Sequence, residues 1–287
     1  MIYILISICC SITVAVLLKL ARRYNIDIVQ AVTWNYLAAI ALAVFFFKPD
    51  VNDVLRRPAP VYLALGILLP VIFWFLAASI KKIGIVKTDI AQRLSLFLPI
   101  LAAYFLFNER LSTLKIIGLV IGILAILLTL VKKQQQPGTG TNWTYPLVVF
   151  FGFGIIDILF KQVAVLKVIP YTTSLIVVFS IAFMISFTYM LVMAIRKRGK
   201  VERINLLCGF ILGIFNFGNI LFYLKAHQAF ASNPTTVFAA MNLGVIILGS
   251  IIGILLFKEK LSKVNYAGLC LALGAVVLIT LSQIYAV

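Results

Sequence analysis

Long apolar runs separated by short polar segments make up this sequence from end to end. Each run approaches the roughly 20 residues that an α-helix needs to cross a bilayer. The runs are continuous and lack the alternation of apolar and polar residues that is typical of membrane β-barrels. The pattern therefore predicts an all-α integral membrane protein with ten transmembrane helices, over residues 2–20, 31–47, 60–80, 88–107, 114–131, 144–162, 171–195, 204–226, 234–257 and 264–284.

One motif occurs twice, and each copy stands between the last two predicted helices of one half of the chain. The first copy holds Phe107, Glu109, Leu111, Ser112 and Gly118, and the second holds Phe257, Glu259, Leu261, Ser262 and Gly268. Positions 109 and 259 differ by 150 residues (259 − 109 = 150). Because each half contains five predicted helices, an odd number, the second half must enter the bilayer upside down relative to the first. Inverted five-helix repeats are typical of secondary transporters, whose binding sites lie near the midplane between the halves.

A polar segment separates the two halves. It begins Lys-Lys-Gln-Gln-Gln-Pro-Gly, a composition that is typical of a flexible linker. The predicted organisation is a first five-helix repeat over residues 1–131, a linker over residues 132–143 and a second five-helix repeat over residues 144–287. Pro99 lies well inside the fourth predicted helix and is expected to bend it.

The composition fits this architecture and narrows the function. Of the 287 residues, 63% are hydrophobic and 11% are charged, and the mean hydropathy is +1.14, whereas soluble domains carry about 25% charged residues. The net charge is +17, but most Lys and Arg stand at the ends of predicted helices, where they anchor the helices and set their topology. We therefore expect the lipid bilayer as a partner and no nucleic acid. The four cysteines lie in apolar runs without metal-ligand spacing, so neither a metal nor a cofactor is predicted.

The paired Phe-x-Glu-x-Leu-Ser…Gly motifs resemble those of the EamA family of the drug/metabolite transporter (DMT) superfamily. The resemblance covers the whole chain in the number of predicted helices, the position of the seam and both copies of the motif. It implies a ten-helix permease, multi-pass in the cell (inner) membrane, that moves small metabolites by alternating access, often as an exporter. It also implies cytoplasmic termini, whereas positive-inside counting of Lys and Arg in the loops favours both termini outside.

The motif residues are expected to fix the fold at the turns that they form. Ser112 and Ser262 stand at the N-cap positions of the fifth and tenth predicted helices, with Glu109 and Glu259 close by. A hydroxyl cap and a nearby carboxylate satisfy and complement a helix N-terminus. A direct part of the motif in transport is the alternative.

Among the eight acidic residues, Asp89 and Asp157 fall inside predicted helices and outside the repeated motif. A basic residue follows each of them four positions later, Arg93 and Lys161 respectively, so the two side chains share a helix face and can pair. An unpaired charge at the midplane costs at least about 2.5–3.5 kcal/mol, so these groups are expected to face a water-filled cavity. An ion pair at the edge of the bilayer, without a role in transport, is the alternative.

Of these four residues, Asp157, Lys161 and Asp89 are the candidates for coupling transport to protons or another ion, and Arg93 is a candidate for binding substrate. In an alignment of the two halves, Asp157 and Arg93 stand opposite apolar residues. A structural requirement shared by both halves would place a charge in each of them, so such a requirement explains neither Asp157 nor Arg93. Protonation would remove the charge of a midspan carboxylate, which makes Asp157 the candidate proton carrier.

Further candidates for substrate binding are polar and aromatic residues within the predicted helices, namely Gln92, Asn242, Asn216, Asn219, Tyr223, Trp34, Asn35 and Trp74. Polar side chains of this kind also hydrogen-bond between helices in lipid, which is the alternative role for each of them. The single histidine, His227, lies at the end of a predicted helix and is expected to face the membrane interface.

These features favour a secondary transporter, driven by a gradient or by exchange, of small polar metabolites such as amino acids or organic acids. The basic candidates would suit an anionic or zwitterionic solute. The alternatives in the same fold are a flippase or translocase of a lipid-linked sugar and a channel-like facilitator. An integral membrane enzyme is disfavoured, because one histidine and few intramembrane carboxylates supply neither a nucleophile–base pair nor a metal cluster. For the oligomeric state, the sequence is compatible with a monomer and with a homodimer.

Overall fold

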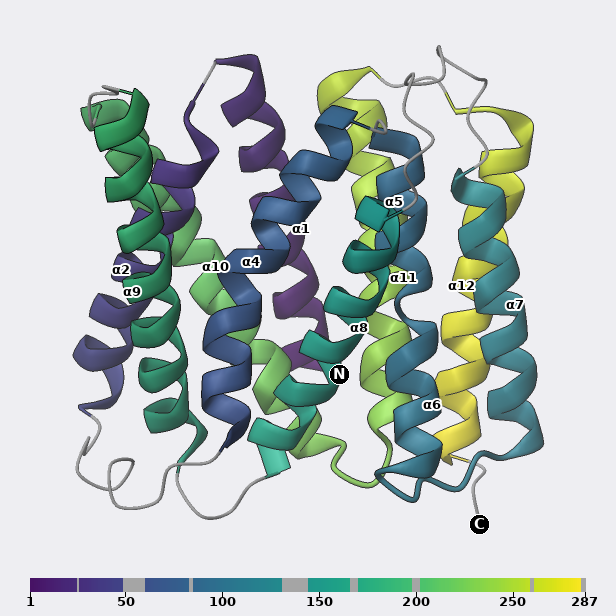
Figure 1. The fold of residues 1–287 in the computed structure, drawn as a ribbon. Helices are drawn as coiled ribbons and strands as arrows, with labels where there is room; N and C mark the ends of the chain where they lie inside the picture. The colour runs from purple at the N-terminus through teal and green to yellow at the C-terminus, as the bar shows by residue number, and fades with distance from the viewer. Residues whose placement is uncertain are drawn as a thin grey trace.

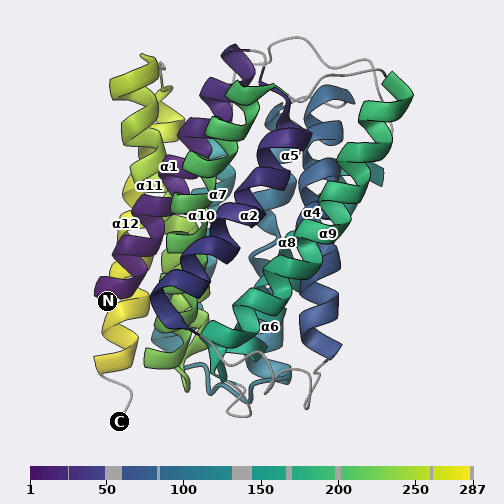
Figure 2. The same cartoon turned by 90° about the vertical axis from the view of Figure 1, so that its left-hand side faces the viewer.

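The computed structural model describes residues 1–24, 26–48, 60–82, 85–130, 144–165, 170–197, 202–258 and 261–284. All regular secondary structure within these ranges is α-helical. The helices are α1 (Ile2–Arg23), α2 (Ile28–Phe47), α4 (Pro60–Lys82), α5 (Ile85–Leu94), α6 (Phe97–Phe105), α7 (Thr113–Leu130), α8 (Thr144–Val165), α9 (Tyr171–Lys197), α10 (Arg203–Ala229), α11 (Pro234–Phe257) and α12 (Lys263–Ile284). They stand side by side in one bundle, with their axes roughly along a common direction (Figures 1 and 2).

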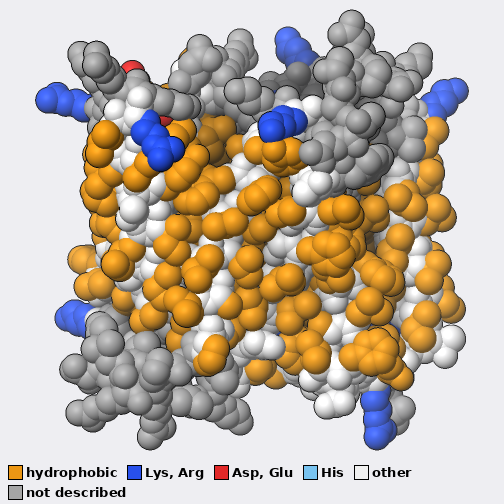
Figure 3. All heavy atoms as spheres, viewed as in Figure 1, with side chains coloured by type: hydrophobic (Ala, Val, Ile, Leu, Met, Phe, Trp, Pro, Cys, Tyr) orange, Lys and Arg blue, Asp and Glu red, His pale blue; other side chains and the backbone are white. Residues whose placement is uncertain are grey.

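The lengths and surfaces of these helices suit a bilayer. Within the described residues, eight helices are long and apolar enough to cross a membrane, and Ile90–Phe105 and Thr113–Thr129 form shorter apolar helical segments. Figure 3 shows apolar side chains covering the middle of the molecule, with Lys and Arg gathered toward its upper and lower rims. This is the distribution that a hydrocarbon core between two polar interfaces requires. The prediction of a multi-pass helical membrane protein is confirmed.

The start of α1 and the end of α12 both lie in the lower half of the bundle in Figure 1. The start of α1 packs on the end of α10, where the rings of Tyr3 and Phe222 stack with their centroids 6.3 Å apart. The end of α12 packs on the start of α7, where Ile279 meets Gly118. We call this the termini end, and we call the opposite end, at which α7 finishes and α8 begins, the linker end.

The expected bend at Pro99 is present as a break between α5 and α6. Proline has no N–H to donate to the carbonyl of Ser95, four residues earlier. That carbonyl instead accepts a bond from the N–H of Leu98 at 3.0 Å, which tightens the turn. The break leaves Gln92 and Arg93 in the last turn of α5, inside the bundle, and this places two candidate residues at its centre.

The glycines of the repeated motif bring α7 and α12 into close antiparallel contact. A Cβ atom on Gly268 would lie 2.8 Å from the backbone nitrogen of Thr129, and one on Gly118 would lie 2.8 Å from Cγ1 of Ile279. Asn265 fastens the same contact, because its Nδ2 donates to the carbonyls at the end of α7, those of Leu128 at 3.1 Å and Thr129 at 3.0 Å. Small residues let helix backbones approach closely in lipid, where packing supplies much of the association energy.

We predict that Gly268→Ala lowers the apparent melting temperature of the purified protein. The new methyl group would press on the backbone of α7, which cannot move aside like a side chain, and overpacking of this kind costs about 1–3 kcal/mol. Gly274→Ala on the same helix is the matched control, because no other atom lies within 4 Å of a Cβ added there. Its melting temperature is expected to stay the same or to rise. Equal melting temperatures for the two variants would contradict the prediction.

Candidate functional site

A polar cavity of about 190 Å³ lies in the middle of the bundle. Helices α1, α4, α5, α8, α10 and α11 contribute to its walls. The structure brings seven of the candidate side chains to this cavity: Gln92, Arg93, Asp157, Asn216, Asn219, Tyr223 and Asn242. Phe73, Phe153 and Phe160 supply apolar parts of the wall, so the lining combines a few polar groups with aromatic surface, as in small-molecule sites generally.

The cavity continues toward the linker end. A hollow of about 360 Å³ shares Arg93 and Asn219 with the central cavity and is also lined by Lys19, Ile80 and Thr88. The last three residues lie near the end of α1, near the end of α4 and near the start of α5, all toward the linker end. The polar space therefore extends from the centre of the bundle to this end.

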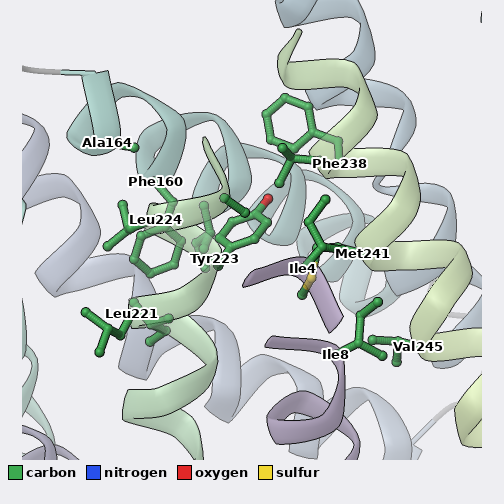
Figure 4. Packing of buried hydrophobic residues seen from close by; sticks show 14 of the residues in the cluster. Ile4, Ile8, Phe160, Ala164, Leu221, Tyr223, Leu224, Phe238, Met241 and Val245 are labelled. Carbon is green, nitrogen blue, oxygen red and sulfur yellow. The ribbon is translucent and has the colours of Figure 1, made fainter. Parts of the chain in front are cut away.

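The carboxylate of Asp157 bonds across helices to α10. Its Oδ1 accepts a hydrogen bond from the hydroxyl of Tyr223 at 3.0 Å. The rings of Phe160 and Tyr223 meet edge to face with their centroids 6.2 Å apart. Figure 4 shows these two rings in a group of buried apolar side chains from α1, α8, α10 and α11. Asp157 thus bonds to Tyr223 on the border between the polar cavity and this apolar group.

The predicted pairing of Lys161 with Asp157 is wrong. Lys161 is 1% exposed, and its Nζ donates to the carbonyl oxygens of Ala231 at 2.8 Å and His227 at 3.4 Å. Among the described residues no ion pair joins Lys161 to a carboxylate. Carbonyls at a helix C-terminus lack intrahelical partners and carry partial negative charge, so they attract a cation. The end of α10 therefore takes Lys161 away from the helix face that it shares with Asp157.

The expectation that His227 faces the membrane interface is also wrong. Its side chain is fully buried, between the rings of Tyr223 and Phe238 at centroid distances of 4.6 and 4.7 Å. Neither ring nitrogen has a hydrogen-bond partner in the described structure. The C-terminal turn of α10 is covered by the start of α11, and this contact was not evident from the position of His227 at a helix end.

The asparagines of the cavity also join helices to one another. Nδ2 of Asn216 donates to Oδ1 of Asn35 at 3.1 Å, and Oδ1 of Asn219 accepts from the hydroxyl of Ser7 at 2.8 Å. Nδ2 of Asn242 donates to the carbonyl of Phe238 at 3.1 Å. An amide carries two donor hydrogens and an acceptor oxygen with two lone pairs, so each side chain keeps bonding capacity beyond these contacts.

Three candidates for substrate binding do not line this cavity. Asn35 is 1% exposed and lies between α2 and α10. Trp34 packs against Gly209 in the same interface, and the ring of Trp74 lies 4.2 Å from that of Tyr189. The candidates Asp89, for its side chain, and Glu259 lie outside the described residues. No group of three or more His, Cys, Asp or Glu side chains that could hold a metal ion occurs in the described part of the chain.

Sequence reasoning missed two serines in the cavity wall, Ser11 and Ser95. A serine in an apolar helix is too common to stand out, and its place on the wall depends on the neighbouring helices. Lys115, at the start of the fifth predicted helix, was not among the candidates either, although its side chain is 2% exposed. One signal was available, because Lys115 and Asn265 differ by the repeat offset of 150 (265 − 115 = 150), which makes this position polar in both halves.

The first copy of the motif forms a buried network at the termini end. Oε1 of Glu109 accepts from Nζ of Lys115 at 2.7 Å, and Oε2 accepts from the backbone N–H of Thr235 at 2.8 Å. Nζ of Lys115 also donates to Oδ1 of Asn233 at 2.9 Å. Glu109 is 3% exposed. The motif glutamate therefore caps the N-terminus of α11, a helix of the other half, with a favourable negative charge.

The serines of both motif copies cap their own helices. The hydroxyl oxygen of Ser112 accepts from the N–H of Lys115 at 3.3 Å, and that of Ser262 accepts from the N–H of Asn265 at 3.2 Å. Oδ1 of Asn265 accepts in return from the N–H of Ser262 at 2.9 Å. These bonds satisfy N–H groups in the first turns of α7 and α12 that have no intrahelical partner.

The architecture and the cavity define a multi-pass helical membrane protein with a polar site at its centre. The model of the EamA-like transporter family matches residues 1–131. A protein from Haemophilus influenzae, described as uncharacterized, is 45% identical over 282 residues, which are 95% of each chain. A solved structure, described only as "Crystal structure of protein", has a TM-score of 0.70 at 17% identity and covers 98% of this chain and 96% of its own, and it shows the fold alone. The chain belongs to the EamA-like transporter family.

We predict that Glu109→Gln and Lys115→Met each destabilise the protein by about 3–5 kcal/mol, because each leaves the other charge buried without its counter-ion. Glutamine keeps an oxygen for the N–H of Thr235, so the first variant tests the charge rather than the helix cap. The double variant is expected to be more stable than either single one, as a double-mutant cycle in urea or by thermal unfolding would measure. Additive losses would contradict an ion pair as the cause.

Proposed function

We propose that this protein is a secondary transporter, driven by a gradient or by exchange, of small polar metabolites such as amino acids or organic acids. It works by alternating access in the cell (inner) membrane, and export is the proposed direction. The observation that carries the proposal is the central cavity, where Asp157 and Arg93 line one space together with three asparagines. Groups of opposite charge in one cavity suit a solute that carries both signs, such as a free amino acid.

The proposed architecture is ten membrane-spanning segments in two inverted repeats. In this arrangement α5 and α6 form one broken segment, and α1–α7 correspond to α8–α12. Helix contacts occur in matched pairs, because α2 packs on α10 as α9 packs on α4, and α1 packs on α10 as α8 packs on α4. The contacts of Gly118 with Ile279 and of Gly268 with Thr129 exchange under the 150-residue offset. In Figure 1, α1 rises from the termini end whereas α8 descends toward it, which further supports the inversion.

The size of the cavity favours a small solute. The central part of the cavity, without the hollow toward the linker end, has a volume of about 190 Å³, below the roughly 300–1,000 Å³ of sites for drug-sized ligands. The charges of Asp157 and Arg93 would orient a zwitterion, with its ammonium group toward Asp157 and its carboxylate toward Arg93. A guanidinium group forms paired hydrogen bonds with a carboxylate, which adds directional specificity. The lining phenylalanines would contact the apolar part of such a solute.

A lipid-linked substrate is the second candidate, and one observation favours it. An apolar hollow of about 330 Å³ lies beside Arg93, among Leu96, Phe97, Ile126 and Phe150. Phe97 is 48% exposed on the surface that would face lipid. An acyl or prenyl chain would fit such a hollow while its anionic head group reached Arg93.

We predict that free amino acids or organic acids raise the melting temperature of the detergent-purified protein, and that Arg93→Ala removes this effect. A ligand that binds the folded state stabilises it by about 2.7 kcal/mol at 100 times its dissociation constant. Arg110→Ala, which removes an exposed arginine from the turn between α6 and α7, is the matched control and keeps the response. Stabilisation by cationic dyes alone would contradict the proposal, and stabilisation by prenyl-phosphate analogues alone would favour the second candidate.

We further predict that Asp157→Asn abolishes substrate flux driven by a pH gradient in proteoliposomes while substrate exchange at equal pH continues. An amide preserves the shape of the side chain and its acceptor for the Tyr223 hydroxyl, but it cannot take up and release a proton. Asp27→Asn at the N-cap of α2 is the control for loss of a carboxylate elsewhere. Unchanged gradient-driven flux in Asp157→Asn would exclude this carboxylate as the proton carrier.

A further inference from the structure

The turn between α10 and α11, residues 230–233, lies beyond the wall of the central cavity toward the termini end, and His227 lies between them, against Tyr223 of that wall. This turn follows the helix end that carries Tyr223 and His227, and it precedes the start of α11 that carries Phe238. The last two side chains are both fully buried. Toward the linker end, Lys19, Ile80 and Thr88 line the continuation of the cavity.

Charged side chains from two other parts of the chain hold this turn at both of its ends. On the α10 side, Lys161 donates to the carbonyls of Ala231 and His227. On the α11 side, Glu109 accepts from the N–H of Thr235, and Lys115 reaches Asn233. Within the turn, Phe230 packs against the hydrophobic core, whereas Ala231 and Ser232 are exposed. The position of the turn therefore depends on this one ring and on polar bonds contributed by α8, by the segment between α6 and α7 and by the first turn of α7.

The closed position also leaves a polar group unsatisfied. Both nitrogens of the His227 ring are buried without a partner, directly behind the turn. A buried donor or acceptor without a partner raises the free energy of the state that contains it. Access of water to His227 would remove this cost, while loss of the Lys161 bonds would oppose the opening. Two opposing contributions at one segment are what a switching element requires, because neither state then dominates strongly.

The two halves of the chain differ at the corresponding position. Lys161 of α8 aligns with Lys19 of α1 in the two repeats, each following an apolar pair. Lys161 is buried beneath the turn, whereas Lys19 is exposed and lines the hollow toward the other end of the bundle. Related lysines toward opposite ends therefore have different surroundings in the same molecule, one buried and one exposed.

From these observations we propose that the turn of residues 230–233 is the gate of the cavity at the termini end and that Lys161 is its latch. Release of Lys161 from the carbonyls of Ala231 and His227 lets the turn move away from α8. Water then reaches His227 and, beyond it, Tyr223 and Asp157. The inference rests on the proposed function, because a gate is needed only for a cavity that serves both sides of the membrane in turn.

The experiment uses His227 as a reporter, since it is the only histidine in the chain. The full-length protein in lipid nanodiscs is treated with diethyl pyrocarbonate, and the rate of His227 modification is followed by mass spectrometry. Lys161→Met keeps the length of the side chain but removes the donor, and it is expected to raise the rate at least about tenfold by favouring local opening. Lys161→Arg, which keeps donors, is expected to stay closer to the wild-type rate than Lys161→Met.

Lys225→Met is the matched control. Lys225 lies two residues before His227, but its Nζ lies over the rings of Tyr3 and Phe222 at 5.9 and 5.6 Å and does not hold the turn. This control is expected to react at the wild-type rate. An unchanged rate in Lys161→Met, with a melting temperature that shows a folded protein, overturns the proposal. An equal rise in Lys225→Met overturns it as well, because the effect would then come from loss of any lysine near this end.

A second variant keeps the test valid if Lys161→Met does not fold. Asn233→Ala removes the contact of the turn with Lys115, together with the bond from Nδ2 of Asn233 to the hydroxyl of Ser232 inside the turn, and leaves the Glu109–Lys115 ion pair in place. It is expected to raise the modification rate of His227 several-fold, and no rise overturns the gate. The readout is access to a side chain and not flux. If the turn opens but the protein binds none of the tested solutes, the proposed substrates are contradicted and the gate is not. If the protein binds a solute but the turn never opens, the gate is contradicted.

Discussion

A charge or a free backbone group inside a bilayer must find its partner within the protein, and the rest of this structure follows from that constraint. The buried pair of Glu109 and Lys115 meets it at the termini end, where it also caps α11 through the N–H of Thr235. Water is absent from the hydrocarbon core, so each unsatisfied group there costs several kcal/mol. One carboxylate thus joins the end of the first half to the start of a helix in the second.

The same constraint explains where the bundle departs from close packing. Helices that pack through glycine, such as α7 on α12 at Gly268, leave little space between their backbones. The central cavity is different, because Arg93, Asp157 and several amides line a space that extends toward the linker end. Intramembrane charges are costly for stability, and this cost is why the cavity that they line is the proposed site of transport.

The close-packed glycines and the gate residues have complementary roles in this arrangement. Glycine contacts between backbones form interfaces that are rigid, because nothing in them can move aside. The turn of residues 230–233 is held instead by a few directional bonds from Lys161, Glu109 and Lys115. Such bonds can be broken and remade one at a time. A bundle built in this way keeps its helix pairs intact while a short segment changes position.

Much of the fold could be predicted from the sequence, because membrane insertion depends on local composition. The apolar runs, the break at Pro99 and the caps at Ser112 and Ser262 involve neighbours along the chain, and their spacing is visible in the sequence. For a similar reason, seven of the side chains that line the cavity could be found in the sequence as polar residues inside apolar runs. A polar group in the hydrocarbon core is costly enough to be noticed wherever it stands.

The sequence by itself thus determined the helical membrane class, the approximate helix positions and the polar residues that need an internal environment. Only the tertiary structure decided which partner each of them takes. Spacing along α8 allowed Lys161 to pair with Asp157, but the carbonyls at the end of α10 and the hydroxyl of Tyr223 bind these two side chains separately. Likewise, His227 is buried because α11 covers it. Helical periodicity defines the face on which a side chain lies, whereas its partner depends on helices that are far away in sequence.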